Sequence, residues 1–479
     1  MAAFFVSCGL SIAIIGLLLI SKLAWRLAVD LPNDRSLHSR PIPRIGGWGV
    51  IPAAVGAAFL FGEAEWPLAG LAMLLFVVSY LDDRFSLPIL VRLTTHAVVS
   101  VAWVIFGPAS LPLLLAGIAV IAIIWWINLY NFMDGANGLA GGMGLIGFLA
   151  YAIAAASHDM VPLTVWSLAL AGASAGFLLF NFSSARVFLG DCGSVPLGFF
   201  VGALGLWGWS GGAWPSWFPF LVFASFFLDA TVTLSRRMIN GEPFWRAHAE
   251  HYYQRLIRSG WSHPRTAVRE YVLMMASASL ATAMLTWSVS AQYAGLVAAA
   301  GVFVGVAILV DRRWLQMQQQ AGKASSGWPT WQYLLIPSLL TGVAVIAVIP
   351  LRDASRYPYI IIEAPDGLRA TFLHRGRPKA AQCEADVAQF VATIQAKCAA
   401  CKIVEENCLD RLEPKQSQML AAAPLDMPSA RLSDGVVTFK SDNPGVALAV
   451  CRESERQASM GPKAGFVECY SPGQVRKLL

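Results

Sequence analysis

The sequence predicts an all-α polytopic membrane protein of about 11–12 transmembrane helices, followed by a small extracytoplasmic α+β domain. Of the 479 residues, 56% are hydrophobic and only 13% are charged, whereas soluble domains carry roughly 25% charged residues. The apolar residues gather into runs of helix length that recur as far as Ile349. The stretch after these runs is more polar and holds six of the eight cysteines.

Twelve apolar runs are the predicted membrane spans, because each approaches, with its flanking residues, the roughly 20 residues that cross a bilayer. They are residues 3–20, 45–61, 68–81, 90–106, 111–127, 139–156, 163–180, 195–209, 218–234, 271–289, 293–310 and 333–349. No Lys or Arg precedes the first run, and Lys22 and Arg26 follow it. A signal peptide carries its positive charge before its apolar core, so we expect an uncleaved first span whose N-terminus lies outside.

The distribution of positive charge predicts the orientation of the remaining spans. Every Lys and Arg before Leu351 lies on or next to a connection that the first span's orientation places in the cytosol. An even number of spans that begins outside also ends outside. We therefore predict a transmembrane domain over residues 1–350 and an extracytoplasmic domain over residues 351–479.

The extracytoplasmic region is predicted to alternate strands and helices. The expected strands are 359–363, 369–373, 402–406, 436–440 and 466–470, and the expected helices are 379–397 and 445–457. Six cysteines in an oxidising compartment predict disulfides, with 15 pairings open. Cys398 and Cys401 have the spacing of a redox pair or half a zinc site, but structural disulfides are the preferred interpretation. Docking to other extracytoplasmic assembly proteins or to a partner subunit is the hypothesis for this domain.

Two predicted cytosolic connections carry candidate phosphate and cation ligands. His38, Arg40 and Arg44 lie in a proline-rich loop after the first span, where they either meet phosphate or anchor the loop at the membrane surface. Asp82 and Asp83 end the third span. Adjacent carboxylates at the membrane boundary repel each other, so they indicate either a bound cation or a solvated polar cap.

The connection after the fifth span is rich in Asn, Asp and Gly. It contains Asn128, Asn131, Asp134, Gly135, Asn137 and Gly138. Gly permits sharp turns and close approach to a ligand, and Asp and Asn offer oxygens to a cation or a base. The alternative is a polar hairpin between two membrane helices.

Asp191 follows Gly190 at the start of the eighth span. A carboxylate beside free backbone N–H groups at a helix N-terminus suits a metal-bridged phosphate, and an ordinary helix cap is the alternative. The neighbouring Cys192 is interpreted as a small space-filling residue.

The longest cytosolic loop contains His248, His251 and Arg255. On a helix these three residues would share one face and could hold a diphosphate. A zinc site lacks a third ligand here, and an amphipathic helix lying on anionic lipid is the alternative. Asp229, inside the ninth span, is predicted to be functional or paired with a neighbouring helix.

Four motifs follow the third, fifth, seventh and ninth spans and therefore share the cytosolic face. They are the acid pair, the Asn/Asp/Gly connection, the Gly190–Asp191 motif and the His/Arg loop. A transporter would place its charges near the bilayer midplane. Carboxylates beside Arg and His at the lipid boundary instead suit a divalent cation and a reaction between a soluble phosphate compound and a lipid.

These motifs resemble those of the polyprenyl-phosphate N-acetylhexosamine-1-phosphate transferases. The resemblance covers residues 1–314. It is carried by His38 with Pro41-x-Pro43-Arg44-x-Gly46-Gly47, by Asp82-Asp83, by Asn128-x-x-Asn131-x-x-Asp134-Gly135-x-x-Gly138 and by Gly190-Asp191-x-Gly193-Ser194. The last loop is similar to that of the branch that initiates O-antigen or other surface polysaccharides, whereas the peptidoglycan translocases carry consecutive His there.

The resemblance implies a cytosolic site in a bacterial inner membrane, where undecaprenyl phosphate attacks a UDP-N-acetylhexosamine and UMP leaves. It implies that Asp191 binds Mg²⁺ (or Mn²⁺), with Asp82 and Asp83 at the metal and the attacking phosphate. Asn131 and Asp134 would line the diphosphate, and Gly135–Gly138 would hold the uracil. His38, Arg44, Asn128, His248, His251 and Arg255 would complete the substrate contacts.

The departure from the family pattern is Asn137, which stands where an acid is usual. An amide carries no acidic proton, which argues against a catalytic-acid role at this position. The sugar is expected to be of the GlcNAc, FucNAc or QuiNAc type. A peptidoglycan translocase-like activity and a non-enzymatic transporter of lipid-linked sugars are the alternatives. Membrane lipid is an expected partner, nucleic acid is not, and a homodimer is compatible with the resemblance.

Overall fold

The computed structural model describes residues 1–32, 40–109, 111–182, 184–242, 248–320, 357–374, 380–398, 400–409, 416, 419, 427–431, 435–441, 444–459 and 468–472. The chain divides into two compact units, Met1–Pro350 and Leu351–Leu479. His38 and the expected span 333–349 lie outside the described residues.

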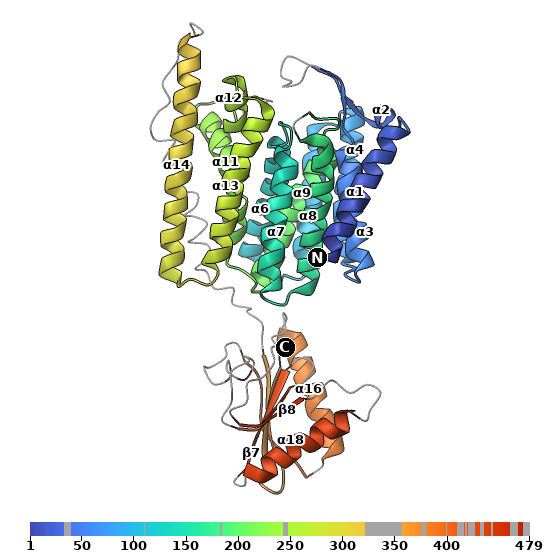
Figure 1. Cartoon of the computed structure of the whole chain (residues 1–479). Coiled ribbons are helices and arrows are strands. Elements are labelled where there is room, and N and C mark those ends of the chain that lie inside the picture. The colour runs from blue at the N-terminus through green and yellow to red at the C-terminus, as the bar shows by residue number, and fades with distance from the viewer. Residues whose placement is uncertain are drawn as a thin grey trace. The chain divides into compact units, whose positions relative to one another are not determined.

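The first unit is built from long helices that run side by side (Figure 1). They are α1 (Ala2–Ile20), α2 (Ala24–Leu27), α3 (Gly46–Leu60), α4 (Trp66–Phe85), α5 (Ile89–Phe106), α6 (Leu113–Phe132), α7 (Leu139–Ala156), α8 (Val161–Asn181), α9 (Asp191–Ser210), α10 (Trp217–Val222), α11 (Ala224–Ile239), α12 (Tyr252–Arg258), α13 (His263–Met284) and α14 (Val289–Gln320). Strands β1 (Val29–Asp30) and β2 (Ile42–Pro43) form a short antiparallel pair.

Seven helices of the described chain are long and apolar enough to cross a membrane: α1, α5, α6, α7, α8, α9 and α14. The other predicted spans correspond to α3, α4, α13 and the pair α10–α11. Three of these segments differ from the seven helices in local features. Helix α4 ends in Asp82-Asp83-Arg84, α13 begins in a charged segment, and the ninth predicted span is interrupted at Phe223.

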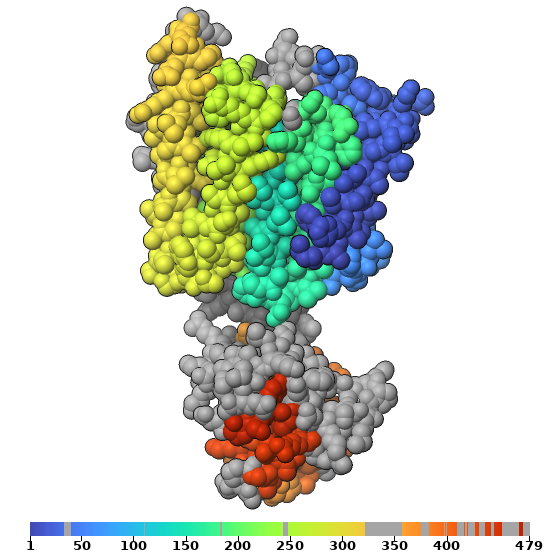
Figure 2. Space-filling model, viewed as in Figure 1, coloured from blue at the N-terminus to red at the C-terminus, as the bar shows by residue number. Residues whose placement is uncertain are grey.

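Helix α9 lies at the centre of the first unit. In its most apolar segment 94% of the residues are buried, compared with 22% in α1, and α1 and α14 lie on opposite sides of the face seen in Figure 2. Close packing depends on small residues, since a Cβ on Gly198 would lie 2.5 Å from the Trp126 carbonyl oxygen. Asp191 is the first residue of this central helix, so the fold holds it at one end of the bundle.

The connections predicted to share a face lie at one end of the helices. In Figure 1, α2 and α12 are at the end opposite the N-terminus. Both follow odd-numbered predicted spans, as do the loops that carry Asp134 and Asp191.

The second unit contains a six-stranded antiparallel sheet of order β5-β3-β4-β7-β6-β8. Its elements are β3 (Tyr357–Glu363), β4 (Arg369–His374), α16 (Ala380–Lys397), β5 (Lys402–Leu409), β6 (Ser429–Arg431), β7 (Gly435–Lys440), α18 (Pro444–Ser459) and β8 (Glu468–Tyr470). Strands β3 and β4 form a hairpin, with Gly367 at φ +81° in its turn. Strand β6 had not been predicted, because three residues give too short a pattern.

The second unit repeats one arrangement twice, as β3-β4-α16-β5 and β6-β7-α18-β8, with β4 paired to β7 between the halves. In each half a disulfide joins the helix to the last strand: Cys383–Cys408 and Cys451–Cys469. The third disulfide is Cys398–Cys401. These three disulfides together are one of the 15 pairings that the sequence left open.

Candidate functional site

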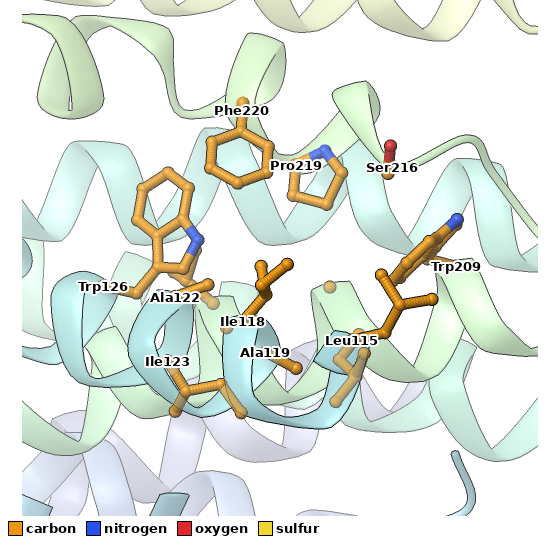
Figure 3. A pocket seen from close by; sticks show the side chains of 14 residues that line it. Leu115, Ile118, Ala119, Ala122, Ile123, Trp126, Trp209, Ser216, Pro219 and Phe220 are labelled. Carbon is orange, nitrogen blue, oxygen red and sulfur yellow. The ribbon is translucent and has the colours of Figure 1, made fainter. Parts of the chain in front are cut away.

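A polar cavity of about 510 Å³ opens between α4, α5, α6, α9 and α11 and the segment that leads into α12. Its polar lining comprises Ser79, Asp82, Arg92, Thr95, His96, Asn128, Asn131, Asp191, His248, His251 and Gln254. A separate apolar cavity of about 90 Å³ lies between α6, α9 and α10 and is lined by Trp126, Pro219 and Phe220 among others (Figure 3). The polar cavity therefore gathers residues from all four predicted motifs.

Asp82 and Asp191 meet across this cavity at one arginine. The Arg92 guanidinium donates to Asp82 Oδ2 at 2.8 Å and lies 3.9 Å from Asp191 Oδ2. The other Asp82 oxygen accepts the Leu87 N–H at 2.7 Å, which fixes the turn after α4. Asp82 is thus a polar cap for the turn after α4 and, at the same time, a carboxylate at the cavity wall.

Asp83 lies against the backbone of α9 and does not line the cavity. Its Oδ2 accepts the Cys192 N–H at 3.0 Å, and its Oδ1 lies 3.5 Å from Arg44. Oδ1 is buried and has no hydrogen bond within the described chain. Gly190 is required beside it, because φ is +75° and a Cβ would lie 2.8 Å from Asp83 Oδ2.

The loop between α1 and α3 packs against the segment that precedes Asp191. Phe188 N–H donates to the Pro43 carbonyl, and Gly46 and Gly47 N–H donate to Phe188 and Leu189, each at 2.8 Å. A Cβ on Gly47 would lie 2.4 Å from the Gly193 nitrogen, so only Gly allows this approach. These contacts explain why the prolines and glycines of this loop accompany the Gly190–Asp191 motif.

Arg44 is held in place by carboxylates on both sides. Its guanidinium donates to Asp30 on β1 at 2.7 Å as well as approaching Asp83. Arg44 is therefore part of the acidic centre, which we define as Asp82, Asp83, Asp134 and Asp191 with Arg44 and Arg92.

The two asparagines of α6 differ in what they contact. Asn131 donates to Asp191 Oδ1 at 2.9 Å and to Ser194 Oγ at 3.0 Å, so it orients the carboxylate that begins α9. Asn128 donates to the Ile124 carbonyl at 2.7 Å and lies 3.5 Å from His96 Nδ1. Both line the cavity, one helical turn apart.

Asp134 lies in the α6–α7 loop close to the other carboxylates. Burial, and then the Asp191 and Asp83 carboxylates, raise the pKa of the Asp134 carboxyl well above its usual range, although Arg44 opposes them. Such crowding of like charges in one region is costly unless a cation balances it.

The rest of the α6–α7 loop is shaped by contacts with α8, α12 and α13. A Cβ on Gly135 would collide with the Tyr253 hydroxyl. Gly138, at φ +80°, donates its N–H to Asn181 Oδ1 at 2.6 Å and accepts from the Tyr271 hydroxyl at 2.6 Å. The backbone N–H of Asn137 donates to His263 Nδ1 at 3.3 Å. None of these loop residues lines the polar cavity.

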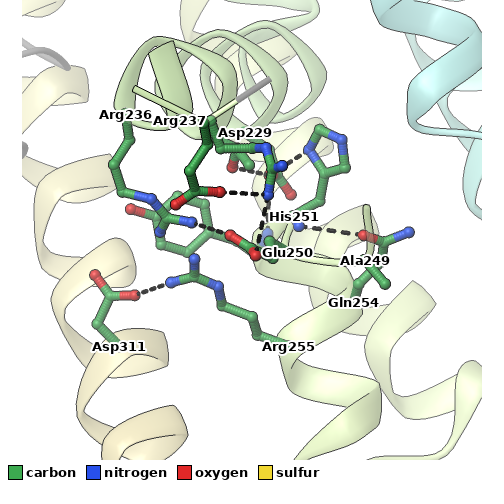
Figure 4. Close-up of polar contacts among 12 residues, drawn as sticks. Asp229, Arg236, Arg237, Ala249, Glu250, His251, Gln254, Arg255 and Asp311 are labelled. Atoms are coloured by element: carbon green, nitrogen blue, oxygen red, sulfur yellow. Dashed lines mark hydrogen bonds and ion pairs between the residues drawn. The ribbon is translucent and has the colours of Figure 1, made fainter. Parts of the chain in front are cut away.

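The predicted helix face of His248, His251 and Arg255 is wrong, because α12 begins only at Tyr252 and His251 is its N-cap (Figure 4). The two imidazoles line the cavity with ring centres 4.9 Å apart. Arg255 points away from them and donates to Asp311 of α14 at 2.6 Å, with both side chains almost completely buried. The structure thus brings the histidines, but not Arg255, to the site.

Asp229 is paired, as one of the two hypotheses for it required. Its Oδ1 accepts the Tyr252 N–H at 2.8 Å and lies 3.3 Å from His251 Nδ1, and its Oδ2 accepts the Tyr253 N–H at 3.1 Å. It therefore caps the N-terminus of α12 from within α11.

Several contributors were not foreseen from the sequence, and three of them make informative contacts. Arg92 and His96 lie on α5, and Asn181 ends α8. The signal for Arg92 was available, since an acid pair at one span end needs a counter-charge and Arg92 begins the next helix. Asn181 gave no signal, because a single amide at a helix end has many structural uses.

The residues present fit a magnesium ion that is completed by substrate. The described residues include no group of three Asp, Glu, His or Cys placed to hold a metal by themselves. Mg²⁺ usually keeps several waters and is bound by one or two carboxylates plus substrate phosphates. Asp191 at the cavity wall and the orphaned Oδ1 of Asp83 supply that kind of donor set.

The bundle and the cavity at its end define a multi-pass membrane protein with a carboxylate-rich polar site. Residues 66–208 match the model of glycosyl transferase family 4. A Bacillus subtilis protein named "Probable undecaprenyl-phosphate N-acetylglucosaminyl 1-phosphate transferase" is 28% identical over 286 residues, which are 55% of this chain and 80% of that protein.

Two further relatives carry similar names. "Undecaprenyl-phosphate alpha-N-acetylglucosaminyl 1-phosphate transferase" of Yersinia pestis is 29% identical over 53% of this chain and 74% of its own length. "Decaprenyl-phosphate N-acetylglucosaminephosphotransferase" of Mycobacterium leprae is 27% identical over 53% of this chain and 76% of its own length.

Proposed function

We propose that the protein transfers an N-acetylhexosamine 1-phosphate from a UDP-sugar to undecaprenyl phosphate and releases UMP. The names of the relatives support transfer of a sugar 1-phosphate to a polyprenyl phosphate. The observation that carries the proposal is one cavity at the end of the bundle, whose wall brings Asp82, Asp191 and Arg92 of the acidic centre together with the imidazoles of His248 and His251. Membrane lipid and a water-soluble nucleotide sugar can both reach such a position.

The excess of carboxylates explains how a site for anionic phosphates can work. Four carboxylates face Arg44 and Arg92, and Arg44 also pairs with Asp30. A divalent cation, Mg²⁺ or Mn²⁺, held by Asp191 with Asp83 or Asp82, would supply the charge neutralisation that phosphoryl transfer needs.

The chain's own residues then divide the remaining work. Asn131 fixes the orientation of Asp191, and Arg92 restrains Asp82 at the cavity wall. In the proposal Arg92 passes from Asp82 to the acceptor phosphate, which is already anionic near neutral pH and needs no strong base. His248 and His251 hold the diphosphate or the departing UMP from the opposite wall.

The α6–α7 loop is proposed to hold the uracil. Its conformation is fixed by Asn181 and Tyr271 at Gly138 and by His263 at Asn137. Asn137 is adjacent to this turn, so its amide in place of the family's usual acid would tune base recognition and leave the chemistry to Asp191. The sugar is proposed to be of the GlcNAc, FucNAc or QuiNAc type, and the product to initiate O-antigen or another surface polysaccharide.

We further propose that the site faces the cytosol and that the disulfide-bonded unit lies in the periplasm. The sorting of Lys and Arg between connections supports this orientation, and six cysteines joined in three disulfides suit an oxidising compartment.

The decisive test supplies purified protein with undecaprenyl phosphate, Mg²⁺ and a panel of UDP-N-acetylhexosamines. The expected result is release of UMP with one or a few sugars, and a matching lipid-diphosphate-sugar. Absence of UMP with every sugar, from protein shown to be folded, would contradict the proposal. Movement of lipid-linked sugar across liposomes without UMP release would favour the transporter alternative.

A further inference from the structure

Three histidines line the polar cavity, and of the adjacent pair His248 and His251 only one has a carboxylate bonded to its ring. His251 Nδ1 lies 3.3 Å from Asp229 Oδ1, and the ring stacks on Phe132 with centres 6.4 Å apart. Both side chains of this contact are almost fully buried. The His251 ring is therefore fixed in position by a carboxylate on one edge and an aromatic ring on its face.

His248 provides the contrast within the same cavity. Its Nδ1 is buried and has no hydrogen bond within the described chain. Burial, and then the neighbouring His251 and Arg237, lower the pKa of His248 to about 4. His248 is consequently neutral near pH 7, so the two rings offer different chemistry to a phosphate.

Asp229 has further oxygen contacts that make its position firm. The Tyr252 and Tyr253 N–H groups and the Thr233 hydroxyl also donate to it, so it cannot rotate away from the ring without uncapping α12. With Nδ1 occupied, Nε2 is the ring nitrogen left for the cavity. When the ring is protonated both nitrogens donate, one to Asp229 and the other to an anion.

We propose that Asp229 is a positioning residue that holds Nδ1–H of His251 and thereby presents Nε2–H to a phosphate oxygen in the cavity. The inference rests on the proposed function for the identity of that phosphate. In this proposal Asp229, within the ninth predicted span, orients a substrate-binding imidazole in addition to capping α12. The carboxylate also neutralises the charge that the imidazolium would otherwise bring into a buried place.

A double-mutant cycle on UMP release tests whether Asp229 acts through His251. We expect Asp229→Asn to lower kcat/KM by roughly 10²-fold, the order that a well-placed proton donor contributes. In a His251→Ala background the same change should have little further effect. Thr233→Val keeps the carboxylate and its bonds to His251 and α12, so it should stay within a few-fold of the unmutated protein. An equal loss from Asp229→Asn in both backgrounds would show that it acts only as a cap and would overturn the proposal.

Nuclear magnetic resonance on protein labelled with ¹⁵N-histidine gives a readout that does not need turnover. The His251 signals are assigned by their loss in His251→Ala. We expect the neutral ring to carry its proton on Nδ1, and a neutral ring that carries its proton on Nε2 instead would overturn the proposal. If no UMP-releasing activity is found but the Nδ1–H form is present, the proposed function fails while the pairing of Asp229 with His251 stands.

Discussion

The acidic centre and the ion-pair network of α11, α12 and α14 lie at the same end of the bundle but differ in charge balance. The network consists of Arg236, Arg237 and Arg255 with Glu242, Glu250 and Asp311. Three arginines thus meet three carboxylates. The acidic centre sets four carboxylates against two arginines, one of which is shared with Asp30.

This difference separates scaffold from site. A buried charge is tolerated when an opposite charge and hydrogen bonds accompany it, and a balanced set has little left to offer a ligand. An unbalanced set of carboxylates has a favourable interaction still to make, with a cation and with the anions that the cation brings. The network therefore fixes α12 against α11 and α14, and the acidic centre is where we expect chemistry.

Asp191→Asn should produce the largest effect, because it removes a charge from the unbalanced set. We expect the rate of UMP release to fall by about 10³-fold or more, as when an electrostatic contact to the transition state is lost. The amide can still accept from Asn131, so folding should be retained. Turnover is measured at several Mg²⁺ concentrations, and the thermal midpoint is measured in detergent.

Asp159→Asn is the matched control for that change. Asp159 lies in the α7–α8 connection at the other end of the helices and has φ +54°, a conformation that Asn adopts readily. We expect unchanged turnover. Unchanged turnover in Asp191→Asn as well would remove this residue from the proposed metal site.

Gly190→Ala should have the next largest effect, because it disturbs the placement of two carboxylates without changing any charge. The new methyl group would approach Asp83 Oδ2, and the backbone of an alanine would be strained at this positive φ. We therefore expect turnover to fall roughly 10- to 100-fold, because Asp83 and Asp191 are placed less accurately. Gly212→Ala is the control for backbone strain alone, because Gly212 also has a positive φ, of +79°, but a Cβ there would meet open space. Equal losses in the two variants would mean that contact with Asp83 is unimportant.

The sequence predicted the site better where charge decides the outcome than where a helix boundary does. The acid pair, Asn131 and Asp191 were foreseen together because charges at span ends on one face have few other uses. Arg255 was misplaced because its assignment assumed a helix through His248, and α12 starts four residues later. The start of a helix depends on the groups that accept its first N–H donors. For α12 such a group is the carboxylate of Asp229, which lies 23 residues before Tyr252 in the chain.

The second unit shows the same limit. Alternation of apolar residues was enough for most of its strands, and β6 was missed because it has three residues. The pairing of β4 with β7 joins the two halves, and the disulfides Cys383–Cys408 and Cys451–Cys469 join residues 25 and 18 positions apart in the sequence. Local patterns do not contain such contacts.

Breaking and then removing the Arg255–Asp311 pair should distinguish scaffold from substrate contact. Arg255→Met leaves the Asp311 carboxylate buried after losing this guanidinium, so we expect the free energy of unfolding to fall by ~3–5 kcal/mol. The double variant Arg255→Met with Asp311→Leu should recover most of that stability, because an apolar pair avoids the buried charge. Stability is measured by thermal or denaturant unfolding in detergent.

Activity of the double variant then decides the role of Arg255. If Arg255 belongs to the scaffold, the stable double variant should turn over within a few-fold of the unmutated protein. If Arg255 binds a phosphate, turnover should stay lost although stability has returned. The second result would place part of the network in the site and weaken the contrast between the two regions.

His248 should give the smallest effect, a pH dependence of stability. Its pKa is lowered to about 4, mainly by burial, while an unfolded His titrates near 6.5. As the pH falls below about 6.5, the unfolded chain takes up a proton that the folded chain does not accept until about 4, so this residue makes stability fall across that window. The effect is modest because the side chain is partly exposed. Thermal midpoints between pH 7.5 and 4.5 should therefore fall less steeply in His248→Gln, whereas His158→Gln, at the other end of the helices, should follow the unmutated protein. Equal slopes in all three proteins would show that His248 is not held neutral, and the imidazole pair would then belong with the charged residues of the acidic centre.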